Sequence, residues 1–204
     1  MPKSDREILA NYIPENAINH ALELIIKHEI NLNIKKARST KLGDFRAPTE
    51  NQAARLSINA NLNPYAFLIT LIHEIAHWVV WKNYKNYRGL NPHGIEWKRT
   101  FTGLMNPFLI DSIYPEDILG ILKKHMINPK ASTTSDIKLM KVLKAYDKGD
   151  KAITLSDLSE GEFFILKDKH FQIIKKNRSR FLCLDLDSHK KFLVHSLAEV
   201  DPIG

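Results

Sequence analysis

Apolar residues recur at two different periods along this chain of 204 residues. A helical period runs through residues 4–29 and 64–87, and Pro14 divides the first of these stretches into two helices. Between the two stretches, apolar residues alternate with polar ones and turns interrupt them, which predicts strands. These strands are Leu32–Arg38, Lys41–Ala47 and Arg55–Asn61. Further helices are predicted at 94–105, 115–126 and 135–147.

The helix before residue 29 has one apolar face. Its apolar residues follow a spacing of three and four. They are Ile18, Ala21, Leu22, Ile25 and Ile26. We expect this face to be buried.

The pattern changes after about residue 152. Short apolar runs separated by turn residues predict a small antiparallel β module of about 50 residues. The runs are Phe163–Leu166, Phe171–Ile174, Phe181–Leu186 and Phe192–Val194. The fold class expected for the whole chain is therefore mixed α+β. A helical domain with a small antiparallel sheet would occupy residues 1–130, a linker and helix 131–151, and the β module 152–204.

The helix predicted at 64–87 contains the candidate metal-binding and catalytic residues. Asn63 is a suitable N-cap and Pro64 suits the first helical position. Within this helix lie His73, Glu74 and His77, in the order H-E-x-x-H. Two histidines four residues apart lie on one helix face and can bind the same Zn²⁺, and the glutamate can act as a general base toward a metal-bound water. Burying these three side chains without a metal or partners would cost several kcal/mol.

A catalytic zinc needs a third protein ligand and one open position. Two candidates lie in the segment Pro92-His93-Gly94-Ile95-Glu96-Trp97. His93 precedes the next predicted helix, and Glu96 lies one turn inside it. A histidine would complete a three-histidine site, and a glutamate would complete a site with two histidines and one glutamate. The spacing alone does not decide between His93 and Glu96.

The two motifs together resemble those of the SprT-like family, which includes the Spartan proteases. The shared pattern is His73-Glu74-x-x-His77 followed by His93-Gly94-x-x-Trp97-Lys98, and the resemblance covers roughly residues 15–125. It implies a zincin-like metallopeptidase domain with Zn²⁺ held by His73, His77 and His93, one ion per chain. Glu74 would be the catalytic base, and the Spartan branch implies protein substrates attached to DNA.

The chain departs from that family in one respect. Many SprT-like proteins continue into a zinc ribbon with paired cysteines, whereas this chain has one cysteine, Cys183. A ribbon of that kind and its second, structural zinc are therefore not expected.

Positive charge gathers around the predicted site. The net charge is +7, and residues 30–100 contain eleven lysines and arginines against four acids. A basic surface of this kind attracts the phosphates of DNA. The candidate contacts are Lys35, Lys36, Arg38, Lys41, Arg46 and Arg55. A solvated face of a basic protein is the alternative interpretation of the same charges.

A second function from a different class fits the same residues. A DNA-binding protein could hold a structural zinc, which requires a fourth protein ligand, and Glu96 is the nearest in sequence. Neither function involves a membrane, because no apolar run reaches membrane-spanning length. The polar N-terminus and the single cysteine lead us to expect a cytoplasmic protein.

Overall fold

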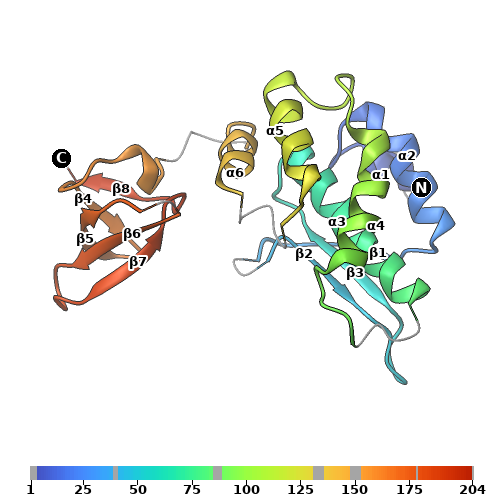
Figure 1. Cartoon of the computed structure of the whole chain (residues 1–204), viewed down its shortest axis with the longest axis horizontal. Helices are drawn as coiled ribbons and strands as arrows, with labels where there is room; N and C mark the ends of the chain where they lie inside the picture. Colours follow the sequence, from blue (N-terminus) through green and yellow to red (C-terminus); the bar gives the residue numbers. More distant parts are fainter. Residues whose placement is uncertain are drawn as a thin grey trace. The chain divides into compact units, whose positions relative to one another are not determined.

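The computed structural model describes residues 4–38, 41–84, 89–130, 136–147, 153–177 and 179–203. These residues form six α-helices, one sheet of three strands and one of five, so the predicted mixed α+β class is confirmed (Figure 1). The chain divides into two compact units, Met1–Asp147 and Lys148–Gly204. Each unit has its own hydrophobic core.

Two short helices begin the first unit. They are α1 (Asp5–Leu9) and α2 (Ile18–Lys27), and the 3-10 turn η1 (Glu15–Ala17) follows Pro14 between them. Ile18 and Ala21 are buried as expected, but Ile26 is 72% exposed. At 3.6 residues per turn Ile26 lies about 80° around the helix from Ile18, at the margin of the apolar face.

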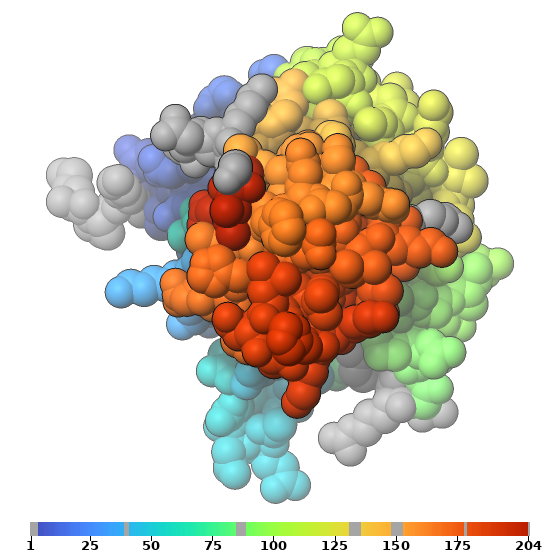
Figure 2. Space-filling view, turned by 90° about the vertical axis from the view of Figure 1, so that its left-hand side faces the viewer, coloured from blue at the N-terminus to red at the C-terminus, as the bar shows by residue number. Residues whose placement is uncertain are grey.

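The first sheet has the order β1-β3-β2, with β1 (Leu32–Lys35), β3 (Arg55–Asn59) and β2 (Gly43–Arg46). β2 pairs with β3 in the antiparallel sense, but β1 pairs with β3 in parallel, so the prediction of an antiparallel sheet is wrong for β1. Alternation in a sequence shows which side chains share a face, but it does not show which strand lies beside which. The turn between β2 and β3 projects from this unit (cyan in Figures 1 and 2).

The two faces of this sheet differ in polarity. Leu56 and Ile58 of β3 are fully buried in the core, together with the partly buried Ile34 and Phe45 from the neighbouring strands. Helix α3 (Pro64–Asn83) packs on β2 and β3. The side chains that alternate with these apolar ones are polar and point to the opposite face.

Three further helices complete the first unit. They are α4 (Ile95–Met105), α5 (Glu116–Ile127) and α6 (Ile137–Lys144), with the 3-10 turn η3 (Asn106–Phe108) after α4. Leu139 and Leu143 of α6 are buried in the core of this unit. Helix α6 belongs to the segment 131–151 that was predicted as linker and helix; residues 131–135 and 148–151 of that segment lie outside the described residues, as do residues 85–87 of the predicted helix 64–87.

The second unit is an antiparallel sheet of order β7-β6-β5-β4-β8. Its elements are η5 (Leu155–Asp157), β4 (Phe163–Leu166), β5 (Lys169–Lys175), β6 (Arg180–Asp185), β7 (Lys191–His195) and β8 (Asp201–Ile203). Phe164, Phe171 and Cys183 are among its buried residues, and its atoms form one continuous orange-to-red body in Figure 2. Strand β8 was not predicted, because Asp-Pro-Ile is short and proline is unfavourable in strands except at an edge.

Among the described residues, no helix has the length and apolar composition that crossing a lipid bilayer requires.

Candidate metal centre

Helix α3 positions two of the predicted ligands. The Asn63 side chain accepts a hydrogen bond from the backbone amide of Ala66 at 3.0 Å, and Pro64 occupies the first turn, as predicted. Asn63 also donates to the backbone carbonyl of Leu143 at 2.8 Å, which ties the start of α3 to α6. Most of the helix is buried, so His73 and His77 are held on a rigid, deeply packed element.

Three imidazole nitrogens converge at one point. His77 Nε2 lies 3.2 Å from His73 Nε2 and 3.1 Å from His93 Nε2, and the third pair is 3.3 Å apart. Zinc–nitrogen bonds of about 2.0–2.1 Å in a tetrahedral arrangement place the ligand atoms about 3.3 Å apart. The three nitrogens therefore have the spacing of three ligands around one Zn²⁺.

Helix α4 brings the third histidine to this point. His93 lies just before the N-cap Gly94, whose amide donates to the Asn91 carbonyl at 2.9 Å in a tight turn. Trp97, one turn inside α4, is almost fully buried, and its ring centroid lies 4.6 Å from that of His73 and 4.7 Å from that of His93. Its indole N–H donates to the backbone carbonyl of His73 at 3.4 Å. Trp97 thus forms an aromatic wall that joins the two motifs.

The structure separates the two candidates for the third ligand. Among the described residues, the group whose ligand atoms all lie within 4.8 Å of one another consists of His73, His77 and His93. Glu96 is not a member of this group, although it lies on the same turn of chain. The geometry thus favours three histidines and leaves a fourth coordination position without a protein ligand from the described part of the chain.

Burial keeps these imidazoles in the neutral form that binds metals. It lowers the pKa of His73 to about 2, with smaller contributions from the neighbouring His77 and His93. It also lowers the pKa of His77 to about 3, and that of His93 in the same direction. A neutral imidazole offers its Nε2 lone pair to a cation, so protons compete weakly with a metal at neutral pH.

Glu74 is buried beside β2. Only 7% of its surface is exposed, and burial is the main reason why its pKa is raised to about 8, followed by the negative charge of Asp44. A hydrogen bond from the backbone of Phe45 and the charges of Arg38 and Lys41 act in the opposite direction. A divalent cation on the three histidines would also lower this pKa.

The contact between β2 and Glu74 was not predicted from the sequence. The backbone of Phe45 contacts the Glu74 carboxylate, and Gly43 lies so close that a Cβ atom there would be 2.6 Å from Glu74 Oε1. A glycine inside a predicted strand is the signal that could have revealed this close approach.

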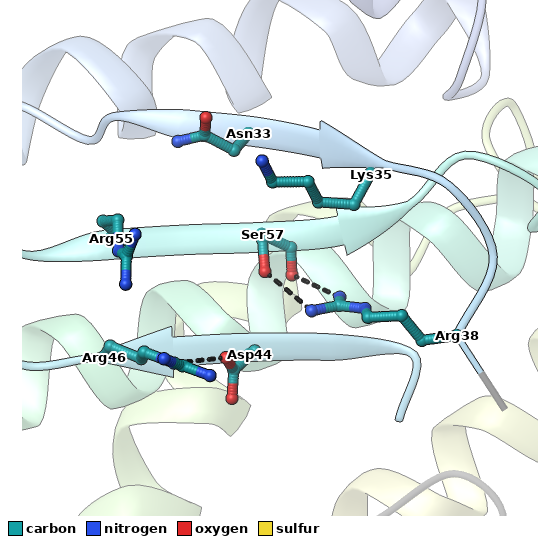
Figure 3. Close-up of a pocket in the computed structure, with 7 residues that line it drawn as sticks. All are labelled: Asn33, Lys35, Arg38, Asp44, Arg46, Arg55 and Ser57. Carbon is teal, nitrogen blue, oxygen red and sulfur yellow. Dashed lines mark hydrogen bonds and ion pairs between the residues drawn. The ribbon is translucent and has the colours of Figure 1, made fainter. Parts of the chain in front are cut away.

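The predicted basic residues gather mainly on the polar face of the first sheet. Lys35, Arg38, Arg46 and Arg55 line an open pocket there, together with Asn33, Asp44 and Ser57 (Figure 3). In Figure 3 these side chains lie in front of the strands, and they alternate with the apolar side chains that pack in the core with α3, so this face is the opposite one from α3. Lys41 adds an ion pair with Asp44 at 2.9 Å, whereas Lys36 is exposed and does not line the pocket.

Some of these cations already have partners within the chain. Arg38 donates to the Asn59 side chain at 2.8 Å and to the Ser57 hydroxyl at 3.0 Å. Arg46 pairs with Asp44 at 2.9 Å. The described residues place five cations on this face, paired or not, against the single acid Asp44, so the face is positively charged. The cations are Lys35, Arg38, Lys41, Arg46 and Arg55.

Comparisons of the chain with protein-family models, with curated proteins and with solved structures give no match. Functional inference for this chain therefore rests on its own side chains.

Proposed function

We propose that this chain is a zinc-dependent metallopeptidase of the SprT-like type. The observation that carries the proposal is the triangle of Nε2 atoms from His73, His77 and His93, at 3.1–3.3 Å, with the buried Glu74 on the same helix as His73 and His77. The resemblance of both motifs to the SprT-like family supports it.

The donor set fits a catalytic zinc. Three neutral imidazoles and no fourth protein ligand among the described residues match the composition of open, catalytic sites. His73, His77 and His93 would hold the ion, one per chain. A zinc ion bound there would supply Lewis acidity, polarising a peptide carbonyl and lowering the pKa of water.

Glu74 would act as the general base and then as the general acid. Its carboxylate would accept a proton from the attacking water and deliver it to the nitrogen of the leaving amine. The Phe45 backbone, which hydrogen-bonds to this carboxylate, would orient it. Burial limits its access to bulk water, so that the proton it accepts is retained for the leaving group.

The position of β2 supports a peptide as substrate. The amide of Asn59 donates to the carbonyl of Leu42, which makes these two residues a hydrogen-bonded pair. Since such pairs alternate along an antiparallel ladder, the backbone groups of Gly43 and Phe45 point away from β3, to the outer edge of the described sheet, where the Phe45 backbone contacts Glu74 and the Gly43 backbone would contact a peptide. Extended peptides bind to sheet edges through main-chain hydrogen bonds, and here the edge lies beside Glu74.

The polar sheet face supports substrates attached to DNA. Its cations lie on β1, β2, β3 and the chain near them, and would contact phosphates. The same face would serve the alternative function, a DNA-binding protein with a structural zinc. That alternative is weakened because Glu96 is not placed with the histidines.

Cleavage assays on two forms of one substrate would test this proposal. Zinc-loaded protein would be incubated with a DNA-binding protein that is either free or crosslinked to single-stranded DNA. We expect cleavage of both, faster for the crosslinked form, and none by Glu74→Gln. Tight DNA binding by zinc-loaded protein without any cleavage would instead support the alternative function.

A further inference from the structure

Gly43 occupies an unusual position in β2. It lies inside a strand, where glycine weakens the structure relative to alanine, yet its backbone is outside the left-handed region that favours glycine. Its partner across the ladder is Ile58, whose side chain is fully buried on the α3 side of the sheet. Position 43 therefore faces α3, and a need for space explains its glycine better than a need for a special backbone conformation.

The space at position 43 is filled by α3. A Cβ atom built on Gly43 would lie 2.6 Å from Glu74 Oε1, 2.7 Å from Glu74 Cγ and 2.8 Å from Thr70 Cγ2. All three distances are shorter than real Cβ contacts, so any side chain there would force a neighbour to move.

These atoms belong to two residues, Thr70 and Glu74, and Thr70 is fixed, as is the strand that carries Gly43. Thr70 is buried, and its hydroxyl donates to the Ala66 carbonyl at 2.8 Å, which holds its methyl group toward β2. The backbone of β2 is held by its pairing with β3 from residue 43 to residue 46. The Glu74 side chain has more torsional freedom than either, so it is the group that an added methyl would displace.

We infer that Gly43 is a positioning residue: its missing side chain leaves the space between α3 and β2 in which the Glu74 carboxylate lies. This inference rests on the proposed function for its catalytic consequence, but the position of the carboxylate can be measured without it. The Phe45 backbone, two residues along β2, hydrogen-bonds to the same carboxylate. Strand β2 thus positions the Glu74 carboxylate in two ways: Gly43 leaves room for it, and the Phe45 backbone hydrogen-bonds to it.

Gly43→Ala tests this inference, with Gly120→Ala as the matched control. Gly120 lies in α5, and apart from its chain neighbours and the backbone of its own helix, no atom of the described residues lies within 4 Å of an added Cβ. We expect Gly43→Ala to bind about one zinc per chain, because it touches none of the histidines, and to keep its KM. Its kcat should fall about tenfold to a hundredfold, since displacing a catalytic group by roughly 1 Å costs on that order. The control should match the wild type in all three quantities.

A second variant keeps the test decisive if Gly43→Ala folds poorly. Thr70→Ser removes the methyl group at 2.8 Å and keeps the hydroxyl that bonds to Ala66. Gly43→Ala combined with Thr70→Ser gives the added methyl the space that the Thr70 methyl occupies, and should regain part of the lost kcat.

Crystal structures of zinc-loaded wild type and Gly43→Ala distinguish a failure of the inference about Gly43 from a failure of the proposed function. We expect the Glu74 carboxylate to be displaced by about 1 Å or more in the variant, on the scale at which catalysis is lost. An unmoved carboxylate, or a kcat within about twofold of the wild type, would overturn the inference. A wild type that binds zinc and cleaves nothing would overturn the proposed function, and the carboxylate position would still decide the inference about Gly43.

Discussion

At the scale of single residues, the site consists of the Nε2 atoms of His73, His77 and His93, and hydrogen bonds among them do not explain why they lie so close together. Each imidazole Nε2 lies 3.1–3.3 Å from two others, and a neutral imidazole carries only one ring proton, so mutual hydrogen bonds cannot satisfy all three. Burial disfavours protonation of each ring, which removes the alternative of charged donors. A shared metal ion accounts for the arrangement more simply.

Zinc content distinguishes His93 from Glu96 as the third ligand. Removing an outer-shell partner costs about 10–100-fold in metal affinity, and removing a direct ligand costs more. We therefore expect His93→Ala to lose zinc on dialysis, while Glu96→Ala retains about one zinc per chain. Metal analysis of the dialysed proteins measures this. The reverse result would make the site one of two histidines and one glutamate.

The protonation of Glu74 makes a second prediction, for the metal-free protein. Its pKa rises from 4.5 to about 8 on folding, mainly through burial, so the folded state binds a proton more tightly than the unfolded chain. The stabilisation is complete below pH 4.5 and is lost as the pH rises toward 8. Glu74→Gln does not titrate, and its free energy of unfolding relative to wild type should increase from pH 5 to pH 8 by on the order of a few kcal/mol.

Urea denaturation with a chelator at both pH values measures this difference. Glu50→Gln, in the exposed turn between β2 and β3, is the control and should follow the wild type. Equal differences at pH 5 and pH 8 for Glu74→Gln would show that Glu74 is not buried as described.

At the scale of elements, the sequence predicts what depends on local pattern. The start of α3 follows from Asn63 and Pro64, and strand β4 was predicted with its observed bounds. The convergence of His73 and His77 follows from helical spacing. The parallel pairing of β1 with β3, the position of Gly43 beside Glu74 and the burial of α6 in the first unit depend on contacts between distant segments, and periodicity alone does not contain them.

Asn63 connects two elements, and its replacement makes the third prediction. Asn63→Ala removes the cap of α3 and the bond to the Leu143 carbonyl of α6. A lost cap costs about 1 kcal/mol and a buried unpaired polar group about 1–3 kcal/mol, so we expect a loss of about 2–4 kcal/mol. Asn63→Ser keeps a capping oxygen and should lose less. Chemical denaturation would measure both, and an alanine variant as stable as the serine variant would contradict the capping role.

At the scale of the whole molecule, the cations of the polar sheet face and the helix that carries His73 and His77 lie on opposite sides of one small sheet. The net charge is +7, and the described cations of the polar sheet face are separated by the sheet from α3 and its histidines. Nucleic acid on this face would leave the metal site accessible to a protein substrate. The pattern of charges along the sequence predicted the cations but not the face on which they lie.

The fourth prediction concerns this face. Lys35→Glu with Arg55→Glu reverses two exposed cations that line the pocket, and Lys123→Glu with Lys124→Glu makes the same change of charge on α5. We expect the first pair to weaken binding of single-stranded DNA by about tenfold or more and to reduce its salt dependence, because contacts with phosphates are lost. Zinc content should not change. Equal weakening by both pairs would mean that net charge, and not this face, attracts the DNA.

The central claim, that His73, His77 and His93 hold a catalytic zinc beside Glu74, is tested most directly by the rate of peptide-bond hydrolysis per bound zinc. Wild type and Glu74→Gln would be loaded to the same measured zinc content and incubated with one unfolded protein substrate. The account predicts hydrolysis by the wild type that disappears with a chelator and returns with zinc, and at least a hundredfold lower rate for Glu74→Gln, a typical cost of losing a general base. Equal rates for the two proteins at equal zinc content, or no hydrolysis by the zinc-loaded wild type, would contradict it.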